Sequence, residues 1–135
     1  MVTNPRHRFA HDESGFTLIE LLVVLIIIGV LLAIAVPSYL GLKDRAERHA
    51  AASNVRSAIP AAEAWYGENS PNSYGGMAVN TLQTQIDAGI KLTTANATNA
   101  GTGYCLSSKV GGWWGWAAGP GGQVQNTGQA ADPCV

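Results

Sequence analysis

Apolar residues are concentrated in one stretch near the start of this chain. The stretch begins at Phe16, and no charged residue occurs between Leu21 and Val36. As a helix, the 21 residues from Phe16 to Val36 are roughly 31 Å long at about 1.5 Å per residue, which is enough to cross a bilayer. The pattern therefore predicts a membrane-spanning helix over residues 16–36.

Beyond Pro37 the apolar residues recur at steps of three and four, which is the period of one face of a helix. Charged residues fill most other positions, and two pairs of opposite sign lie four residues apart, Lys43 with Glu47 and Asp44 with Arg48. Pro60 should bend this helix or mark a break in it. The predicted apolar face consists of Ala51, Val55, Ala58, Ile59, Ala62, Trp65 and Tyr66.

Turn-forming residues between Gly67 and Pro71 should end the helix, which we therefore expect to occupy residues 16–69. Its first half has no core of its own to enter, so it must meet lipid or other subunits. From Phe16 to about Tyr66, at about 1.5 Å per residue, it is a helix on the order of 75 Å long.

Residues 70–135 are richer in glycine and polar residues and are expected to form a small head. We predict a short helix over 81–88, capped near Asn80, and strands over 91–94, 103–110 and 113–118. Gly111-Gly112 is a hairpin signal between the last two strands. Alternation along the last strand places Trp114 and Trp116 on one face and Trp113 with Gly115 on the other. The predicted class is α+β, with a small antiparallel sheet packed on the long helix.

Composition and charge exclude several functions. The formal net charge is −1 and no basic tract is present, so no nucleic-acid partner is predicted. His7 and His11 lie in the first fifteen residues, which leaves His49 alone among the helix charges. One histidine and two distant cysteines do not form a zinc site of usual spacing, and no phosphate loop or nucleophile–base pair is found. We therefore expect a protein that is not an enzyme and has no metal or cofactor.

A single carboxylate, Glu20, lies at the start of the apolar stretch. Placing an ionised carboxylate in hydrocarbon costs a few kcal/mol, so an acid at this position indicates a function. A favourable contact with the helix macrodipole is worth only a few tenths of a kcal/mol at a surface. That contact does not explain an acid followed by 16 apolar residues.

The string Gly15-Phe16-Thr17-Leu18-Ile19-Glu20-Leu21-Leu22-Val23-Val24 resembles the cleavage and methylation motif of type IV prepilins. The resemblance implies that a prepilin peptidase removes a leader of residues 1–15 by cutting between Gly15 and Phe16, and that Phe16 is then N-methylated. Arg6 and Arg8 provide the basic flank expected on the cytoplasmic side. Asp12 and Glu13 depart from the basic leaders that are usual in this family.

The same resemblance gives Glu20 a role in assembly. The new amine on Phe16 and the Glu20 carboxylate lie one turn apart, about 6 Å along the axis. The family implies that the acid pairs with the terminal amine of a neighbouring subunit. Buried charges persist only when they are paired, so a subunit docked out of step would leave both uncompensated.

Two other N-terminal segments would produce a similar apolar run. A secretory signal peptide would be cut after Ala35, because Ala33-Ile34-Ala35 matches the A-x-A pattern. A plain signal anchor would not be cut at all. Neither gains from a carboxylate at Glu20, which favours the prepilin interpretation. Either alternative would make the chain a secreted or membrane-anchored binding module that uses its tryptophan-rich head.

The family also bears on the middle and the end of the chain. In related pilins the stretch between a glycine and a proline placed like Gly29 and Pro37 can lose helicity inside the filament; a simple proline kink is the alternative. In an exported chain two cysteines favour a disulfide, and Cys105 with Cys134 is the one possible pair. Type IV pilins also carry a terminal loop bounded by a disulfide.

The function implied by the resemblance is that of a structural subunit of a type IV pilus. Such a subunit is held in the cell membrane and is then assembled with copies of itself, by an ATPase-driven machine, into a helical homopolymer outside the cell. A pseudopilin of a type II secretion system carries the same motif and is the alternative. The disulfide-bounded C-terminus favours the pilin.

Overall fold

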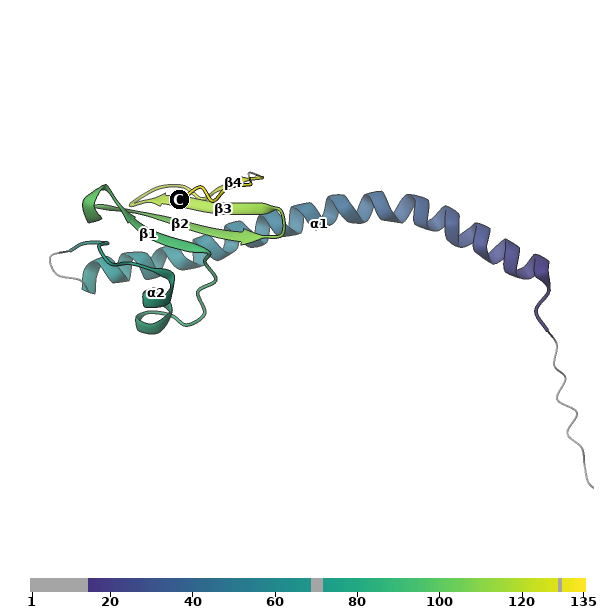
Figure 1. The fold of residues 1–135 in the computed structure, drawn as a ribbon, viewed down its shortest axis with the longest axis horizontal. Helices are drawn as coiled ribbons and strands as arrows, with labels where there is room; N and C mark the ends of the chain where they lie inside the picture. Colours follow the sequence, from purple (N-terminus) through teal and green to yellow (C-terminus); the bar gives the residue numbers. More distant parts are fainter. Residues whose placement is uncertain (1–14, 69–71, 129) are drawn as a thin grey trace, which may run out of the picture. The chain divides into compact units, whose positions relative to one another are not determined.

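The computed structural model describes residues 15–68, 72–128 and 130–135. The chain divides after Ser38 into two compact units, and helix α1 contributes to both. Its elements (Figure 1) are helices α1 (Leu18–Glu68) and α2 (Val79–Gln85), strand β1 (Thr94–Thr98), the 3-10 turn η1 (Asn99–Gly101), and strands β2 (Gly103–Val110), β3 (Trp113–Gly119) and β4 (Gln125–Thr127). This arrangement confirms the predicted α+β class.

Helix α1 has 51 residues and contains Gly29, Pro37 and Pro60. The predicted break at Pro60 is wrong. Pro60 has no backbone N–H to donate to the Arg56 carbonyl. Because Arg56 and Pro60 are both exposed, water can donate to that carbonyl instead. The neighbouring Ala58, Ala61 and Ala62 are buried and hold the helix on the core on either side of the proline.

The first unit contains the apolar part of α1. Every residue described in it, from Gly15 to Ser38, is exposed. The most apolar 18-residue window of α1 has a mean hydropathy of 3.2, and none of it is buried. By length and composition this is a helix that could cross a membrane.

The second unit contains a four-stranded antiparallel sheet in the order β1-β2-β3-β4. Strand β2 has the predicted bounds, and the Gly111-Gly112 hairpin joins it to β3 as predicted. Strand β1 was predicted at 91–94 but starts where that prediction ends, and β4 was not predicted. Asn and Ala, the residues between Thr94 and Thr98, have low strand propensity; their pairing with β2 decides their conformation.

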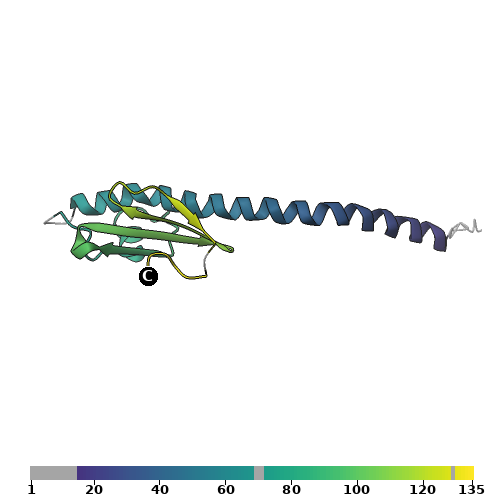
Figure 2. The same cartoon turned by 90° about the horizontal axis from the view of Figure 1, so that it is seen from above.

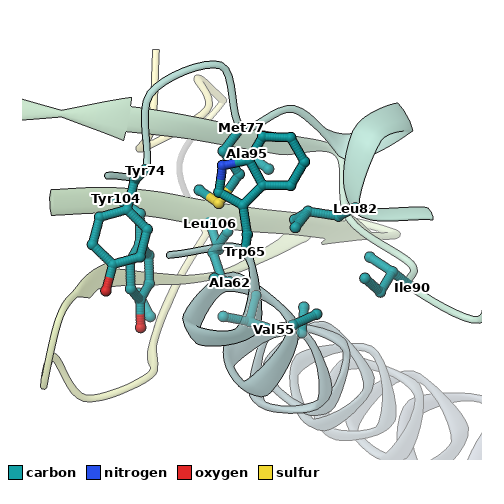
Figure 3. Packing of buried hydrophobic residues seen from close by; sticks show 13 residues of the cluster. Val55, Ala62, Trp65, Tyr74, Met77, Leu82, Ile90, Ala95, Tyr104 and Leu106 are labelled. Atoms are coloured by element: carbon teal, nitrogen blue, oxygen red, sulfur yellow. The ribbon is translucent and has the colours of Figure 1, made fainter. Parts of the chain in front are cut away.

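One face of the sheet packs on the C-terminal part of α1 (Figures 1 and 2). Tyr104 and Leu106 of β2 and Ala117 of β3 are buried in this core. Figure 3 shows Val55, Ala62 and Trp65 of α1 turned toward the same cluster. The predicted helix face is confirmed, since Ala51, Val55, Ala58, Ala62 and Trp65 are buried and Ile59 and Tyr66 are partly buried.

Helix α2 begins and ends earlier than predicted, and its cap is not Asn80. The N–H of Ala78 donates to Thr81 Oγ1 at 2.9 Å, and that hydroxyl donates back to the Ala78 carbonyl at 2.8 Å. A threonine inside the first turn therefore supplies the bonds that were expected from a preceding asparagine. Leu82 is the buried residue of α2.

The tryptophans of β3 alternate as predicted. Trp113 and Gly115 face α1, where Trp113 lies beneath Arg48 and Gly115 lies against Ala51. Trp114 is on the other face and is also buried, with Lys109 Nζ 5.3 Å from its ring centroid. The face turned away from the helix is thus not left open to solvent at this position.

Candidate processing and assembly site

The N-terminal end of α1 is fixed by Thr17. The N–H of Glu20 donates to Thr17 Oγ1 at 3.3 Å, and the N–H of Leu21 donates to the Thr17 carbonyl at 3.3 Å. Thr17 is therefore the N-cap, and Glu20 is the third helical residue of a Thr-x-x-Glu capping pattern. The cap was missed in the sequence, although this spacing could have revealed it. Phe16 lies outside the helix, one residue before the cap.

Glu20 lies in the first turn of α1, where the helix macrodipole favours a negative charge. Phe16, Leu21 and Val24 share with it a shallow hollow of about 260 Å³. Phe16 is 81% exposed. The acid is thus presented at the surface among apolar side chains, and it can accept a cation that approaches from outside the chain.

Gly29 and Pro37 both lie inside α1. Proline removes the N–H that would pair with the carbonyl of Ala33. One residue later, the hydroxyl of Ser38 donates to the Ile34 carbonyl at 3.2 Å. Loss of helicity between Gly29 and Pro37 concerns the assembled filament and stays a prediction.

The C-terminal end is held to the sheet by the predicted disulfide. Cys105 of β2 is bonded to Cys134, and their Cα atoms are 5.5 Å apart. Asn96 Nδ2 of β1 donates to the Cys134 carbonyl at 3.2 Å. The bridge and this hydrogen bond together fix the end of the chain to two adjacent strands.

Asp132 adds a further attachment that the sequence did not indicate. Its carboxylate accepts hydrogen bonds from Thr94 Oγ1 at 2.5 Å and from the Cys134 N–H at 2.9 Å. Burial alone would raise the pKa of Asp132. The bonds from Thr94 and Cys134, with a smaller contribution from Ser107, nevertheless hold that pKa below its ordinary value.

The start of the second unit is attached to the β2–β3 turn. Glu47 Oε1 lies 3.6 Å from Lys43 Nζ, and Glu47 Oε2 accepts the Gly112 N–H at 3.2 Å. The predicted Lys43–Glu47 pair is therefore confirmed. The predicted Asp44–Arg48 pair is wrong. In the described part of the chain Arg48 forms no ion pair with Asp44, and its guanidinium instead lies 3.9 Å from the Trp113 ring centroid.

Three tyrosine rings pack together near the end of α1, and one of them is hydrogen-bonded to a carboxylate. The ring centroids of Tyr66 and Tyr74 are 4.7 Å apart, and those of Tyr74 and Tyr104 are 4.9 Å apart (Figure 3 shows the second pair). Tyr74 donates its hydroxyl hydrogen to Glu63 Oε2 at 2.8 Å. Burial, followed by the hydrogen bond to Glu63, raises the pKa of Tyr74. Burial, followed by the charge of Glu63, raises the pKa of Tyr104 to about 12. Both hydroxyls therefore remain protonated donors across the physiological range.

The chain thus combines an exposed apolar helix, which has one acid in its first turn, with a small head closed by a disulfide. Known proteins with related sequences show which family has these features. A family model described as the prokaryotic N-terminal methylation motif matches residues 11–36. The type IV wide pilus major component PilA4 of Thermus thermophilus is 33% identical over 112 residues, which cover 79% of this chain and 81% of that protein. The chain belongs to the type IV pilin superfamily.

Two further relatives share shorter segments. The type IV major pilin protein PilA of Myxococcus xanthus is 38% identical over 65 residues, 48% of this chain and 27% of that protein. The type II secretion system core protein G of Pectobacterium carotovorum is 43% identical over 47 residues, 35% of this chain and 30% of that protein. These two matches thus span less than a third of each relative. No solved structure matches the chain significantly.

Proposed function

We propose that this chain is a structural subunit of a type IV pilus. A prepilin peptidase removes residues 1–15 and methylates Phe16, and the mature subunit is held in the cell membrane by the apolar part of α1. The assembly machinery then moves it into an extracellular homopolymer. Glu20 pairs with the terminal amine of the adjacent copy and sets the step between copies.

The observation that carries this proposal is the wholly exposed apolar part of α1 with Glu20 in its first turn. A helix of this kind needs lipid or other copies of itself to cover it, because the head lies in the other unit and has its own core. A carboxylate at the end of such a helix is stable in an apolar filament interior only beside a cation. Cleavage after Gly15 would supply one on every copy.

The match to the Thermus pilus component favours a pilus over a secretion pseudopilus. That match covers 79% of the chain and therefore includes much of the head, whereas the match to the Pectobacterium secretion protein covers 35%. The disulfide-closed C-terminus supports the same choice. The alternative remains a pseudopilin of a type II secretion system, since a core protein of such a system is 43% identical to this chain over 47 residues.

The experiment that tests processing is intact-mass analysis of the chain purified from its source organism. We expect a mature chain that begins at Phe16 and carries one added methyl group. A chain that begins at Val36 would show a secretory signal peptide, and a chain that keeps residues 1–15 would show a plain anchor. Either result would overturn the proposal.

A second measurement separates the two filament classes. Immunogold labelling at the native expression level should decorate filaments that extend from the cell surface. Labelling confined to the cell envelope, together with loss of protein secretion on deletion of the chain, would identify a pseudopilin instead.

A further inference from the structure

The C-terminal segment, residues 130–135, is bonded to the face of the sheet that is turned away from α1. In both views the chain ends on that side of the sheet (Figures 1 and 2). Tyr104 and Leu106 of β2 belong to the core on the helix side, so alternation places Cys105 and Ser107 on the other face. Ser107 is nevertheless fully buried, and Cys105 is 7% exposed. Part of the outer face is therefore covered, and the segment that is bonded there covers it.

One pair of residues on this face holds Asp132. Thr94 of β1 lies opposite Ser107 of β2. Thr94 Oγ1 donates to the Asp132 carboxylate at 2.5 Å, and the side chain of Ser107 adds a smaller stabilising interaction. A hydrogen bond to a charged acceptor is about twice as strong as one between neutral groups. Asp132 therefore attaches the segment to the sheet without help from a sulfur atom.

The adjacent pair on the same face holds Cys134. Asn96 lies opposite Cys105. Asn96 Nδ2 donates to the Cys134 carbonyl at 3.2 Å, and Cys105 forms the disulfide with Cys134. Asp132 and Cys134 are two residues apart, and so are the strand residues that hold them, because neighbours on one face of a strand are two residues apart. The spacing of the segment thus matches the spacing of its attachment points.

Asp132 also fixes the backbone that carries the second sulfur. Its Oδ1 accepts the Cys134 N–H at 2.9 Å, while its Oδ2 accepts the hydroxyl of Thr94. Neither bond involves a sulfur atom, so a reduced chain, in which both cysteines are thiols, can form both bonds. A contact that holds two reacting groups together raises their effective concentration, because the entropy of bringing them together is already lost.

We propose that the C-terminal segment docks on the sheet before the disulfide forms, and that Asp132 is the residue that positions Cys134 over Cys105. This device belongs to the head alone. It goes beyond the proposed function and operates in the same way in a pilus and in a pseudopilus.

Closure of the disulfide needs an oxidant, which we take to be a second disulfide. The thiolate of one cysteine attacks that disulfide, forms a mixed disulfide and releases one thiolate. The other cysteine then attacks the sulfur of the first, which forms the bond between Cys105 and Cys134 and releases the second thiolate. The two protons of the protein thiols pass to the two released thiolates. Asp132 acts on the second step, which is intramolecular.

The rate of that second step in the full-length chain tests the proposal. The reduced chain in detergent micelles is mixed with glutathione disulfide and quenched with an alkylating agent. Intact-mass analysis then separates the dithiol, mixed-disulfide and closed forms. We expect Asp132→Ala to slow conversion of the mixed disulfide to the closed form by about tenfold, because the bonds that hold Cys134 near Cys105 are lost. Circular dichroism checks that the reduced chains keep their fold.

Asp87→Ala is the matched control. Asp87 Oδ1 accepts the Gly89 N–H at 2.8 Å, which is the same two-residue turn as at Asp132, but Asp87 follows α2 and has no cysteine two residues further on. This variant should close at the wild-type rate.

Two variants of Thr94 separate positioning from strand stability. Thr94→Val removes the hydroxyl and should slow closure, although valine favours strands at least as well as threonine. Thr94→Ser keeps a donor and should close nearly as fast as wild type. If reduced Asp132→Ala loses its fold, these two variants decide the question, and equal closure rates in them would overturn the proposal.

Other outcomes would also overturn it. A wild-type closure rate in Asp132→Ala, with faster opening by reduced glutathione, would show that Asp132 attaches only after the bond has formed. Loss of the native circular-dichroism spectrum on reduction of the wild-type chain would show that no sheet is present for the segment to dock on.

Discussion

Glu20 differs from its neighbours on α1 because it is the one ionisable side chain among exposed apolar ones. If it pairs with the amine of an adjacent copy, Glu20→Ala leaves that cation without a partner in an apolar interior, which costs several kcal/mol per contact. We expect the variant to be cleaved and inserted normally but to yield at least tenfold less sheared filament on an immunoblot. Glu20→Asp keeps the charge and should retain part of the yield. Full yield from Glu20→Ala would show that the acid is not an assembly contact.

Ala100 holds a conformation that suits glycine better. The turn between β1 and β2 has positive φ at Asn99 (50°) and Ala100 (55°). Asparagine tolerates this region, whereas alanine loses about 1 kcal/mol there. Ala100→Gly should therefore stabilise the head by about 0.5–1 kcal/mol and raise its melting temperature by a few degrees, measured by circular dichroism. Ala97→Gly, inside β1, is the control and should lower the melting temperature. A lower value for Ala100→Gly would show that the turn is not strained.

At the scale of elements, α1 and β3 approach so closely that backbone meets backbone. A Cβ atom added at Gly115 would lie 2.5 Å from the carbonyl carbon and oxygen of Ala51 and 2.7 Å from the Ala52 nitrogen. Neither obstacle is a flexible side chain, so α1 and the sheet would have to separate. Glycine on the strand and alanine on the helix therefore set the distance between the two elements.

Gly115→Ala tests that distance. Because overpacking in a dense core costs about 1–3 kcal/mol, we expect a clear drop in the head's melting temperature and in its denaturant midpoint. Gly112→Ala is the matched control, since nothing lies within 4 Å of a Cβ atom there and the N–H bonded to Glu47 is kept. Equal stability of the two variants would mean that α1 can move away from the sheet at little cost.

The C-terminal segment should be sensitive to acid through Asp132. Its pKa is lower in the folded head than in the unfolded chain, so its contribution to stability is complete above the unfolded pKa of about 3.9 and is lost as the pH falls through the folded value. Asp132→Asn should therefore be less stable than wild type at pH 7, and the difference should narrow below about pH 4. Glu68→Gln is the control. A difference that is constant from pH 7 to pH 3 would contradict this role.

The sequence predicted some elements well and others poorly, for physical reasons. Strand β2 contains aromatic and β-branched residues and is bounded by glycines, and the Gly111-Gly112 pair is a turn signal; both were predicted correctly. Strands β1 and β4 contain asparagine, glutamine and alanine, whose strand conformation comes from pairing with β2 and β3. The effect of Pro60 was overestimated, because the buried alanines on either side of it keep the helix continuous.

For the whole molecule, the membrane segment and its acid are visible in the sequence because hydrophobicity and charge are local properties. The attachments within the head are not. Arg48 lies over Trp113, and Asp132 bonds to Thr94, across long stretches of chain, and no spacing rule connects such residues. The disulfide is the exception, because two cysteines in the whole chain allow one pair.

Thr17 lies on the mature side of the proposed cut, so the first turn of α1 is closed by a residue that every processed copy keeps. Removal of residues 1–15 would therefore change the charge at the end of the helix and leave its conformation alone. Before the cut, the nitrogen of Phe16 is a neutral amide; afterwards it is a cation. The leader would thus keep the Phe16 nitrogen uncharged on a helix whose first turn is already formed. The peptidase would then control when assembly begins by creating a positive charge, without a change in the fold of the helix.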